Sequence, residues 1–414
     1  MSDALRLVLY SLTSLVLGYS VIALPSAGFI FRDPARYGIT DGQYGLLFLP
    51  MVAATITTGF LFQNLVSRFS RHRIFCTGFV LTALYLFLVL AAAFMPGRPA
   101  AVFWLLAAAQ TFLGLGFALL MSSVSLFSIE LFPNHRTSIL TAIHAMFGAG
   151  ALLSPLVLDL WSRMGWWQGQ IVTGILELAL VGAAALSSGS VPRAASASED
   201  AASGDLAAPA FPRDRTPVPN PFAAFAALPA RAKGFVAVLV LYGTIEAVIA
   251  NWSTIYLTRD RGFSPTTAAV CLSLFWGFLT GGRVLATFLA IWIEPRKLFR
   301  VAPFIALGGI LLLNTVRQEA AVFLPYMIIG LGCSYTFPVS VSLTTRYHEA
   351  QRELLPSFML AGLMTGVGAG SSAIGFFSGM GLFTLEQAFG ASAAAAAGLC
   401  VSFFFLTRKP LGLS

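Results

Sequence analysis

The chain has 414 residues, of which 57% are hydrophobic and only 10% are charged, and its mean hydropathy is +0.82. A water-soluble globular protein carries roughly 25% charged residues, so this chain cannot cover its surface with charge, and a soluble fold is excluded. The formal net charge of +8 does not indicate nucleic-acid binding, because the basic residues are spread through short loops.

Twelve membrane-spanning helices are predicted in chain order, because several apolar runs exceed the ~18 residues that mark such a helix. The first six lie at 6–31, 43–66, 74–95, 101–129, 138–161 and 168–187. The second six lie at 234–257, 266–292, 299–316, 320–345, 355–380 and 384–406. The short alternating segments of a β-barrel are missing. The first run is too long for the core of a cleavable signal peptide, so it is interpreted as a retained span.

Residues 188–232 separate the two groups of spans. This stretch is rich in Ala, Ser and Pro and lacks periodic apolar residues, which is typical of a flexible linker. A regulatory role is the alternative. The expected domains are therefore a six-helix bundle at 1–187, the linker at 188–232 and a second bundle at 233–414.

The positive-inside rule predicts the orientation. With the N-terminus inside, the inner loops hold most of the 25 Lys and Arg residues, and this remains true when the linker is left out. We therefore expect an inner-membrane protein with both termini and the linker in the cytoplasm.

Several chemistries leave no signature in the chain. The four cysteines fall in four different apolar runs and form neither a disulfide framework nor a zinc spacing. There is no GxxxxGK[ST] loop for ATP and no HExxH metal motif. No clustered nucleophile constellation of an enzyme stands out either. No enzyme activity, cofactor or metal is expected.

The two halves of the chain resemble each other. GITDGQYGLL at 38–47 aligns with GFSPTTAAVC at 262–271, and the same register carries SRHRIF at 70–75 onto EPRKLF at 294–299. Further matches pair Gly114, Gly116, Gly148 and Gly150 with Gly330, Gly332, Gly368 and Gly370. Such a repeat is the mark of a transporter whose substrate site lies between the halves near the bilayer midplane. The glycines let helices approach closely, either for movement or for static packing.

This arrangement of six plus six spans resembles the major facilitator superfamily. QNLVSRFSRHRI at 63–74 is similar to the signature of that family between spans two and three, a glycine and an aspartate followed by basic residues. Ser67 stands in place of the aspartate and Ser70 where the family often has glycine, so the relay that latches the outward-facing state lacks its carboxylate. The basic part, which the resemblance implies as a conformational gate, is kept by Arg68, Arg71 and Arg73.

Three spans resemble the fucose-permease-like branch more closely. There a glutamate and a tryptophan in span seven precede an aromatic-Gly and a Gly-Arg pattern in span eight, as in YGTIEAVIANWSTIYL and SLFWGFLTGGRVLATFLA here. LTAIHAMFGAGALLSPL at 140–156 is similar to the fifth span, with Ser154 in place of a glycine before Pro155. The resemblance implies solute transport, often of sugars and often coupled to protons.

Two charges lie deep inside predicted spans. Glu246 is near the middle of 234–257, about 18 Å from its inner end, and Arg283 is roughly 14 Å from the inner end of span eight. Charges at such depth are costly and usually face a cavity or a partner. We hypothesise that Glu246 and Arg283 form an ion pair that protonation or substrate opens. A purely structural pair, or Arg283 binding helix-end carbonyls or an inner-loop acid, is the alternative.

Other ionisable residues have weaker arguments. His144 lies in span five, about 10 Å from the cytoplasmic end, and it either relays protons or is a packed hydrogen-bonding residue. Glu177 in span six belongs to what the resemblance makes the outer scaffold, so a structural role is favoured. Asp159 and Glu130 sit near span ends and are interpreted as interfacial.

Further polar and aromatic residues are candidates for the substrate site. They are Tyr19, Ser122, Ser125, Tyr242, Asn251, Trp252 and Tyr335. Hydroxyl groups, an amide and aromatic faces suit a neutral polar or amphipathic solute. The sequence thus predicts an all-α membrane protein, two six-helix bundles related by pseudo-two-fold symmetry, that works as a monomeric proton-coupled permease by alternating access. A drug or metabolite exporter and a non-transporting membrane sensor are the alternatives.

Overall fold

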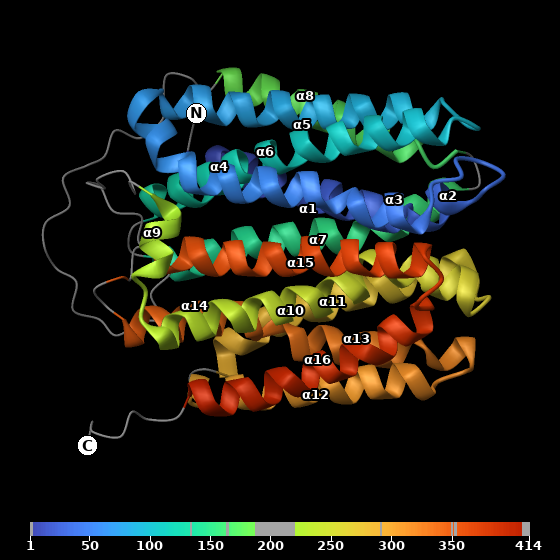
Figure 1. The fold of residues 1–414 in the computed structure, drawn as a ribbon. Coiled ribbons are helices and arrows are strands. Elements are labelled where there is room, and N and C mark those ends of the chain that lie inside the picture. The colour runs from blue at the N-terminus through green and yellow to red at the C-terminus, as the bar shows by residue number, and fades with distance from the viewer. Residues whose placement is uncertain are drawn as a thin grey trace, which may run out of the picture.

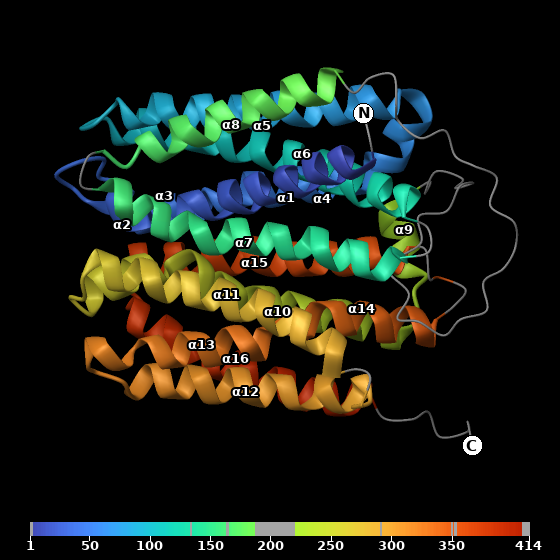
Figure 2. The same cartoon turned by 180° about the vertical axis from the view of Figure 1, so that it is seen from behind.

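The computed structural model describes residues 3–132, 135–162, 165–186, 220–289, 292–348, 351 and 354–407. Every regular element among these residues is helical, and the long helices run side by side along one axis (Figures 1 and 2). Eleven helical segments within the described residues are long and apolar enough to cross a membrane. The helix α8, with 19 residues, runs beside them and completes the predicted set of twelve.

The first half contains α1 (Asp3–Ser26), α2 (Gly28–Arg32), α3 (Asp41–Leu46), α4 (Phe48–Arg68), α5 (Arg71–Ala93), α6 (Pro99–Leu131), α7 (Arg136–Ser162) and α8 (Gln168–Leu186). The second half contains α10 (Ala230–Ile255), η2 (Tyr256–Asp260), α11 (Pro265–Leu289), α12 (Pro295–Thr315), η3 (Glu319–Ala321), α13 (Phe323–Ser334), α14 (Thr336–Tyr347), α15 (Leu355–Gly379) and α16 (Leu385–Leu406). The prediction of an all-α, twelve-helix membrane protein is confirmed.

Three spans that were predicted as continuous are interrupted. The span 6–31 breaks at Ala27, between α1 and α2 and two residues after Pro25, and the other two breaks follow directly from prolines. Proline lacks an N–H group, so the carbonyl four residues before it loses its helical partner. Pro50 releases the carbonyl of Leu46, where α3 ends, and Pro338 releases that of Ser334, where α13 ends. Each span therefore consists of two helical pieces in line.

Most of the predicted linker, residues 188–219, lies outside the described residues. Its last part is structured, although the sequence was interpreted as a linker up to residue 232. Asn220 accepts hydrogen bonds from the backbone N–H groups of Phe222 at 2.9 Å and Ala223 at 3.3 Å, and Pro221 occupies the first turn. This capping starts the short helix α9 (Pro221–Ala226) in spite of the apolar-poor composition upstream.

The glycine matches of the repeat recur as matched helix contacts. A Cβ on Gly114 of α6 would overlap the carbonyl oxygen of Met51 in α4, and a Cβ on Gly330 of α13 would overlap that of Phe275 in α11. Met51 and Phe275 are themselves equivalent in the repeat alignment. The turn glycines Gly38 and Gly262, also equivalent, have φ of 64° and 66°. The two halves are thus built on the same backbone contacts.

The bundle has two distinct ends. We call the end that carries α2, α3 and η2 the α3 end, and the opposite end, where α9 lies and where the first and last described residues lie, the α9 end (Figures 1 and 2). The helices α5 and α8 form one edge of the molecule and α12 and α16 the other, while α7 and α15 lie between the halves (Figure 1).

Candidate functional site

Glycines bring the halves into contact along two helix pairs. Gly148 of α7 packs directly against Thr280 of α11, and Gly368 of α15 packs against Val52 of α4, with the added Cβ at 3.2 Å from the valine side chain. Gly148 and Gly368 are equivalent in the repeat. The interface between the halves therefore follows the same pseudo-two-fold symmetry as their interiors.

Four predicted residues meet at this interface. His144 of α7, Glu246 of α10 and Arg283 of α11 lie within electrostatic reach of one another through Arg283, and Tyr242 lies one turn before Glu246 and next to it. We call these four residues the Glu246 cluster. It joins both halves of the molecule, since His144 belongs to the first half and the others belong to the second.

The position of His144 on α7 shows which way its side chain faces. Leu153, Leu156 and Leu160 are exposed at helical spacing and mark the lipid-facing stripe, which Ala142 continues toward the α9 end. His144 follows Ala142 by two residues, about 200° around the helix, so it lies on the opposite side and faces the bundle. Its side chain is nevertheless exposed. The interface that is closed at Gly148 is therefore open one turn closer to the α9 end.

The other members of the cluster lie at the end of this opening that is deepest in the bundle. Glu246 and Arg283 are half-buried, whereas Tyr242 is only 1% exposed. A carboxylate and a guanidinium in the middle of spans are tolerated where they reach water or each other. The arrangement brings a carboxyl group, a guanidinium and a hydroxyl group together beside this opening.

The α3 end is closed by ionic contacts that the sequence did not predict. Asp41, 7% exposed at the start of α3, accepts from Arg32 of α2 at 2.5 Å and from Arg259 of η2 at 2.9 and 3.0 Å. Ser378 of α15 donates to the same carboxylate at 2.7 Å. We call Arg32, Asp41, Arg259 and Ser378 the Asp41 latch. It ties α2 and α3 of the first half to η2 and α15 of the second.

Further contacts close the same end below the latch. The Thr254 hydroxyl donates to the carbonyl of Pro25 at 2.7 Å, and the Tyr44 hydroxyl donates to the carbonyl of Asn251 at 2.9 Å. The rings of Tyr44 and Trp252 stack edge to face with centroids 5.0 Å apart. The α1–α10 and α3–α10 contacts therefore leave this end shut.

Three of the predicted substrate residues have other surroundings. Asn251 donates to the Ser371 hydroxyl at 2.7 Å, and Trp252 is fully buried against Tyr44, so both pack the closed end. Tyr19 turns toward Gly169 and Thr173 of α8, inside the first half.

The remaining substrate candidates lie on α6 and at the α13–α14 break. The Ser125 hydroxyl donates to the carbonyl of Met121 at 2.8 Å, and Ser122 is half-buried. Tyr335 is 5% exposed at the break itself. Of the seven predicted residues, Tyr242 is the member of the Glu246 cluster.

The predicted gate residues lie at the α9 end. Arg71 forms an ion pair with Glu130 at 2.6 and 2.8 Å, which joins the start of α5 to the end of α6, while Arg68 and Arg73 are exposed. Glu130 thus supplies a carboxylate to the basic loop that has lost its own at Ser67. Asp159 accepts from Thr266 at 3.0 Å and links α7 to α11 at the α3 end.

The comparisons with known proteins agree with this architecture. The model of the Major Facilitator Superfamily matches residues 7–352. An uncharacterized MFS-type transporter of Yersinia pestis is 25% identical over 167 residues, a match that spans 39% of this chain and 39% of that protein.

Solved transporters share the fold over almost the whole chain. A bacterial homolog of the human lysosomal transporter Spinster, inward-facing and occupied, aligns with a TM-score of 0.75 at 13% identity, covering 99% of this chain and 98% of that one. A mutant of the nucleoside transporter NupG gives 0.72 at 15% identity, covering 98% and 99%. The transporter FucP in the outward conformation gives 0.58 at 16% identity, covering 98% of each chain. The chain belongs to the major facilitator superfamily, and it is accordingly a secondary transporter and not an enzyme.

Proposed function

We propose that the protein is a proton-coupled symporter that takes up a small polar or amphipathic solute across the inner membrane. The observation that carries this proposal is the Glu246 cluster, a carboxylate and a guanidinium in the middle of spans that lie where the interface changes from closed to open. A carboxylate held in such a place changes its charge by taking up one proton, and this change alters its electrostatic interaction with a nearby cation.

The orientation follows from the basic loops. The α9 end carries Arg68, Arg71 and Arg73, and the start of α10 adds Arg231 and Lys233. By the positive-inside rule this end is cytoplasmic, as are both termini. In this orientation the Asp41 latch closes the outer side and the exposed His144 lies toward the inner side, which supports an inward-open state. Residues 1–187 and 233–414 are the two bodies that move, joined by the linker.

Charge compensation gives the proposed coupling. When Glu246 is ionised, its charge favours that of the half-buried Arg283, and removing one charge of such a pair is costly. Protonation of Glu246 therefore favours binding of a solute that offers Arg283 an oxygen acceptor. Movement to the inward-open state exposes the cluster toward His144, where the proton and the solute leave. The reset of the empty carrier follows when Glu246 and Arg283 compensate each other again.

The first experiment finds the solute by thermal shift of the purified protein. Sugars, carboxylates, amino acids, iron chelates and, because NupG is a nucleoside transporter, nucleosides make up the screen. A ligand at 100-fold over its Kd stabilises the folded state by about 2.7 kcal/mol. A solute that stabilises the wild type and not Arg283→Gln is expected.

Liposome flux then separates the alternatives. Solute uptake accompanied by an alkaline shift outside the vesicles marks a proton symporter. An acid shift in exchange for solute marks an exporter that works as an antiporter, which would refute uptake. A solute that binds but never crosses the membrane would mark a sensor and refute transport.

A further inference from the structure

A second group of buried polar side chains lies inside the first half, away from the Glu246 cluster. Its members come from α1, α5, α6 and α8, and none is more than 7% exposed. They are Tyr19, Thr82, Tyr85, Gln110, Gln170 and Glu177. We call these six residues the polar column. Buried polar groups are ordinarily hydrogen-bonded, so each one that is not calls for an explanation.

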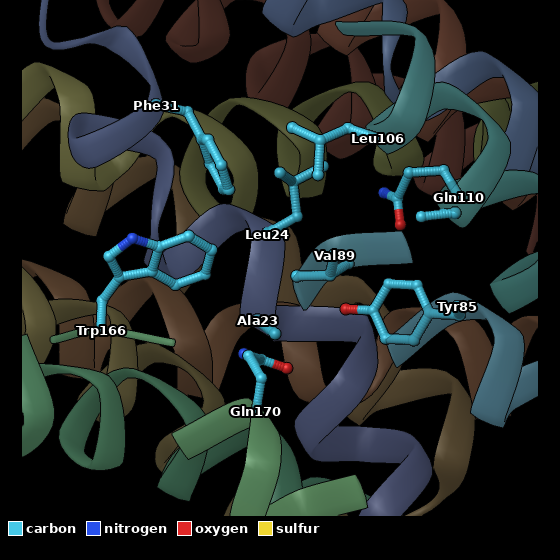
Figure 3. Close-up of a pocket in the computed structure, with 10 residues that line it drawn as sticks. Ala23, Leu24, Phe31, Tyr85, Val89, Leu106, Gln110, Trp166 and Gln170 are labelled. Carbon is cyan, nitrogen blue, oxygen red and sulfur yellow. The ribbon is translucent and has the colours of Figure 1, made fainter. Parts of the chain in front are cut away.

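The column is continuous along α8. Gln170, Thr173 and Glu177 follow one another at spacings of three and four, which places them on one helix face. Gln170 lines a void of about 10 Å³ together with Tyr85 and Gln110, and the polar ends of these three side chains turn toward it (Figure 3). Tyr85 in turn lies within electrostatic reach of Glu177. A void of this size holds about one water molecule.

The hydroxyl groups around Glu177 already donate hydrogen bonds to backbone carbonyl groups. Thr82 donates to the carbonyl of Gly78 at 3.1 Å, Tyr85 donates to that of Ser20 at 2.9 Å, and Thr173 donates to that of Gly169 at 2.9 Å. A hydroxyl that has donated keeps only its lone pairs for further bonds. The surroundings of Glu177 are therefore rich in acceptors.

Several acceptors in the column have no partner among the described residues. They are Oε2 of Glu177, which is 1% exposed, Oε1 of Gln170 and Oε1 of Gln110. The Gln110 Nε2 group is a donor that also has no partner among the described residues. The titratable groups around Glu177 are Tyr85 of α5 and, across Tyr85, Tyr19 of α1, and the Thr82 side chain is its hydrogen-bonding neighbour. None of these groups carries a positive charge. An ionised Glu177 would thus be both uncompensated and surrounded by oxygen lone pairs.

A proton resolves both problems at once. It removes the charge of the carboxyl group and converts Oε2 from an acceptor into a donor. A water molecule would supply hydrogen bonds without positive charge. A bound Na⁺ would need a shell of several oxygens around one point. Among the described residues, Thr82 is the side chain that hydrogen-bonds to this carboxyl group, whereas Tyr85 is only within electrostatic reach of it.

We propose that Glu177 is a second proton-binding site of this transporter, separate from the Glu246 cluster and occupied at neutral pH. The protonated carboxyl group donates to a lone pair of the Thr82 hydroxyl, its hydrogen-bonding neighbour. Tyr85 and the void extend the column toward the α3 end, where Phe31 and Trp166 pack edge to face with centroids 5.0 Å apart and cap it. This assignment replaces the purely structural role expected for Glu177, and it does not depend on whether Glu246 couples transport.

Infrared difference spectroscopy of the purified protein tests the proposal without any transport assay. At pH 7, the wild-type spectrum minus that of Glu177→Gln should contain the C=O stretching band of a protonated carboxylic acid, shifted in D₂O. An exposed glutamate, with a pKa of about 4.3, is fully ionised at this pH and gives no such band. Glu386→Gln is the control, because Glu386 lies at the surface in an ion pair with Arg317, and its difference spectrum should lack the band.

A second variant keeps the test decisive if Glu177→Gln does not fold. Thr82→Val removes the hydroxyl neighbour and keeps the shape of the side chain, so the carboxylic-acid band should persist at a shifted frequency. Carboxylate bands alone in the Glu177→Gln difference spectrum, or no effect of Thr82→Val on any carboxylic-acid band, would overturn the assignment. A stabilisation by NaCl over KCl that Glu177→Gln abolishes would overturn it in favour of a sodium site.

Discussion

The interiors of the two halves share a backbone and differ in chemistry. With the offset of 224 residues that aligns Gly38 with Gly262, Thr82 and Tyr85 of the polar column correspond to Ala306 and Gly309. Ala306 occupies the matching place in the structure as well, because a Cβ on Gly332 would overlap it just as a Cβ on Gly116 would meet Thr82. The second half has no counterpart of the column at these positions.

The edge of the second half contains stacked aromatic rings. Phe299 and Phe403 stack with centroids 3.7 Å apart at an interplanar angle of 6°, and Tyr256 and Phe389 stack at 4.1 Å. Its charged groups, Glu246 and Arg283, face the interface, where the same offset gives Ile22 and Gly59 in the first half. The repeat thus fixes where helices touch, and each half then places its polar residues for a different task.

The largest expected effect concerns Glu246, whose equivalent in the first half is the uncharged Ile22. Glu246→Gln removes the titratable group and the carboxylate charge that faces Arg283, so the rate of uptake should fall at least about tenfold, or ~1.4 kcal/mol, and lose its pH dependence. The measurement is solute flux into liposomes between pH 5 and 8. Glu386→Gln, which removes a surface carboxylate, should leave flux unchanged. Normal flux across pH in Glu246→Gln would exclude coupling through this residue.

The next effect tests the shared backbone. Gly114→Ala and Gly330→Ala each push a methyl group into a carbonyl oxygen of the neighbouring helix, and overpacking of this kind costs about 1–3 kcal/mol. Both variants should lower the free energy of unfolding in detergent by similar amounts. Gly308→Ala is the matched control, because nothing lies within 4 Å of its added Cβ, and it should be neutral or stabilising. Unequal losses at Gly114 and Gly330 would contradict equivalent helix contacts.

The Asp41 latch breaks the symmetry at the α3 end and has an intermediate expected effect. Asp41→Asn weakens the contacts of Arg32 and Arg259 and should shift the equilibrium toward the outward-open state by about tenfold, roughly 1.4 kcal/mol. Spin labels at Leu46 and Leu382, two exposed residues of the two halves, should show a longer distance in the variant. Arg317→Gln, which breaks a surface ion pair at the same end, should leave the distance distribution unchanged. Unaltered distances in Asp41→Asn would show that the latch does not hold this end closed.

The sequence predicted the helices well because hydropathy over some twenty residues depends little on tertiary structure. The close helix contacts at Gly114 and Gly330 could also be predicted, since such contacts require small residues in both halves of the repeat. The direction in which a side chain points could not be predicted from the sequence. Tyr19 lies in the middle of a span as expected, yet the packing of α1 turns it toward α8.

The Asp41 latch could not be predicted from the sequence for a different reason. Asp41 and Arg259 are 218 residues apart, and each looks like an ordinary loop charge until the fold brings them together. Glu177 shows the opposite case, since its residue type was noticed and its role was assigned from the position of span six alone. Its unpartnered oxygen becomes visible only when the hydroxyl groups around it are seen to donate elsewhere.

The smallest expected effect concerns the turns that precede the matched helices α3 and α11. Gly38 and Gly262 have φ of 64° and 66°, a region in which a Cβ clashes with the following carbonyl at a cost of roughly 1 kcal/mol. Gly38→Ala and Gly262→Ala should therefore each lower the free energy of unfolding by about this amount, while asparagine, which tolerates this conformation, should lower it less. Thermal unfolding of the four variants measures the difference. If alanine and asparagine were equivalent at both turns, strain would not govern them, and their identical conformation would follow from helix packing instead.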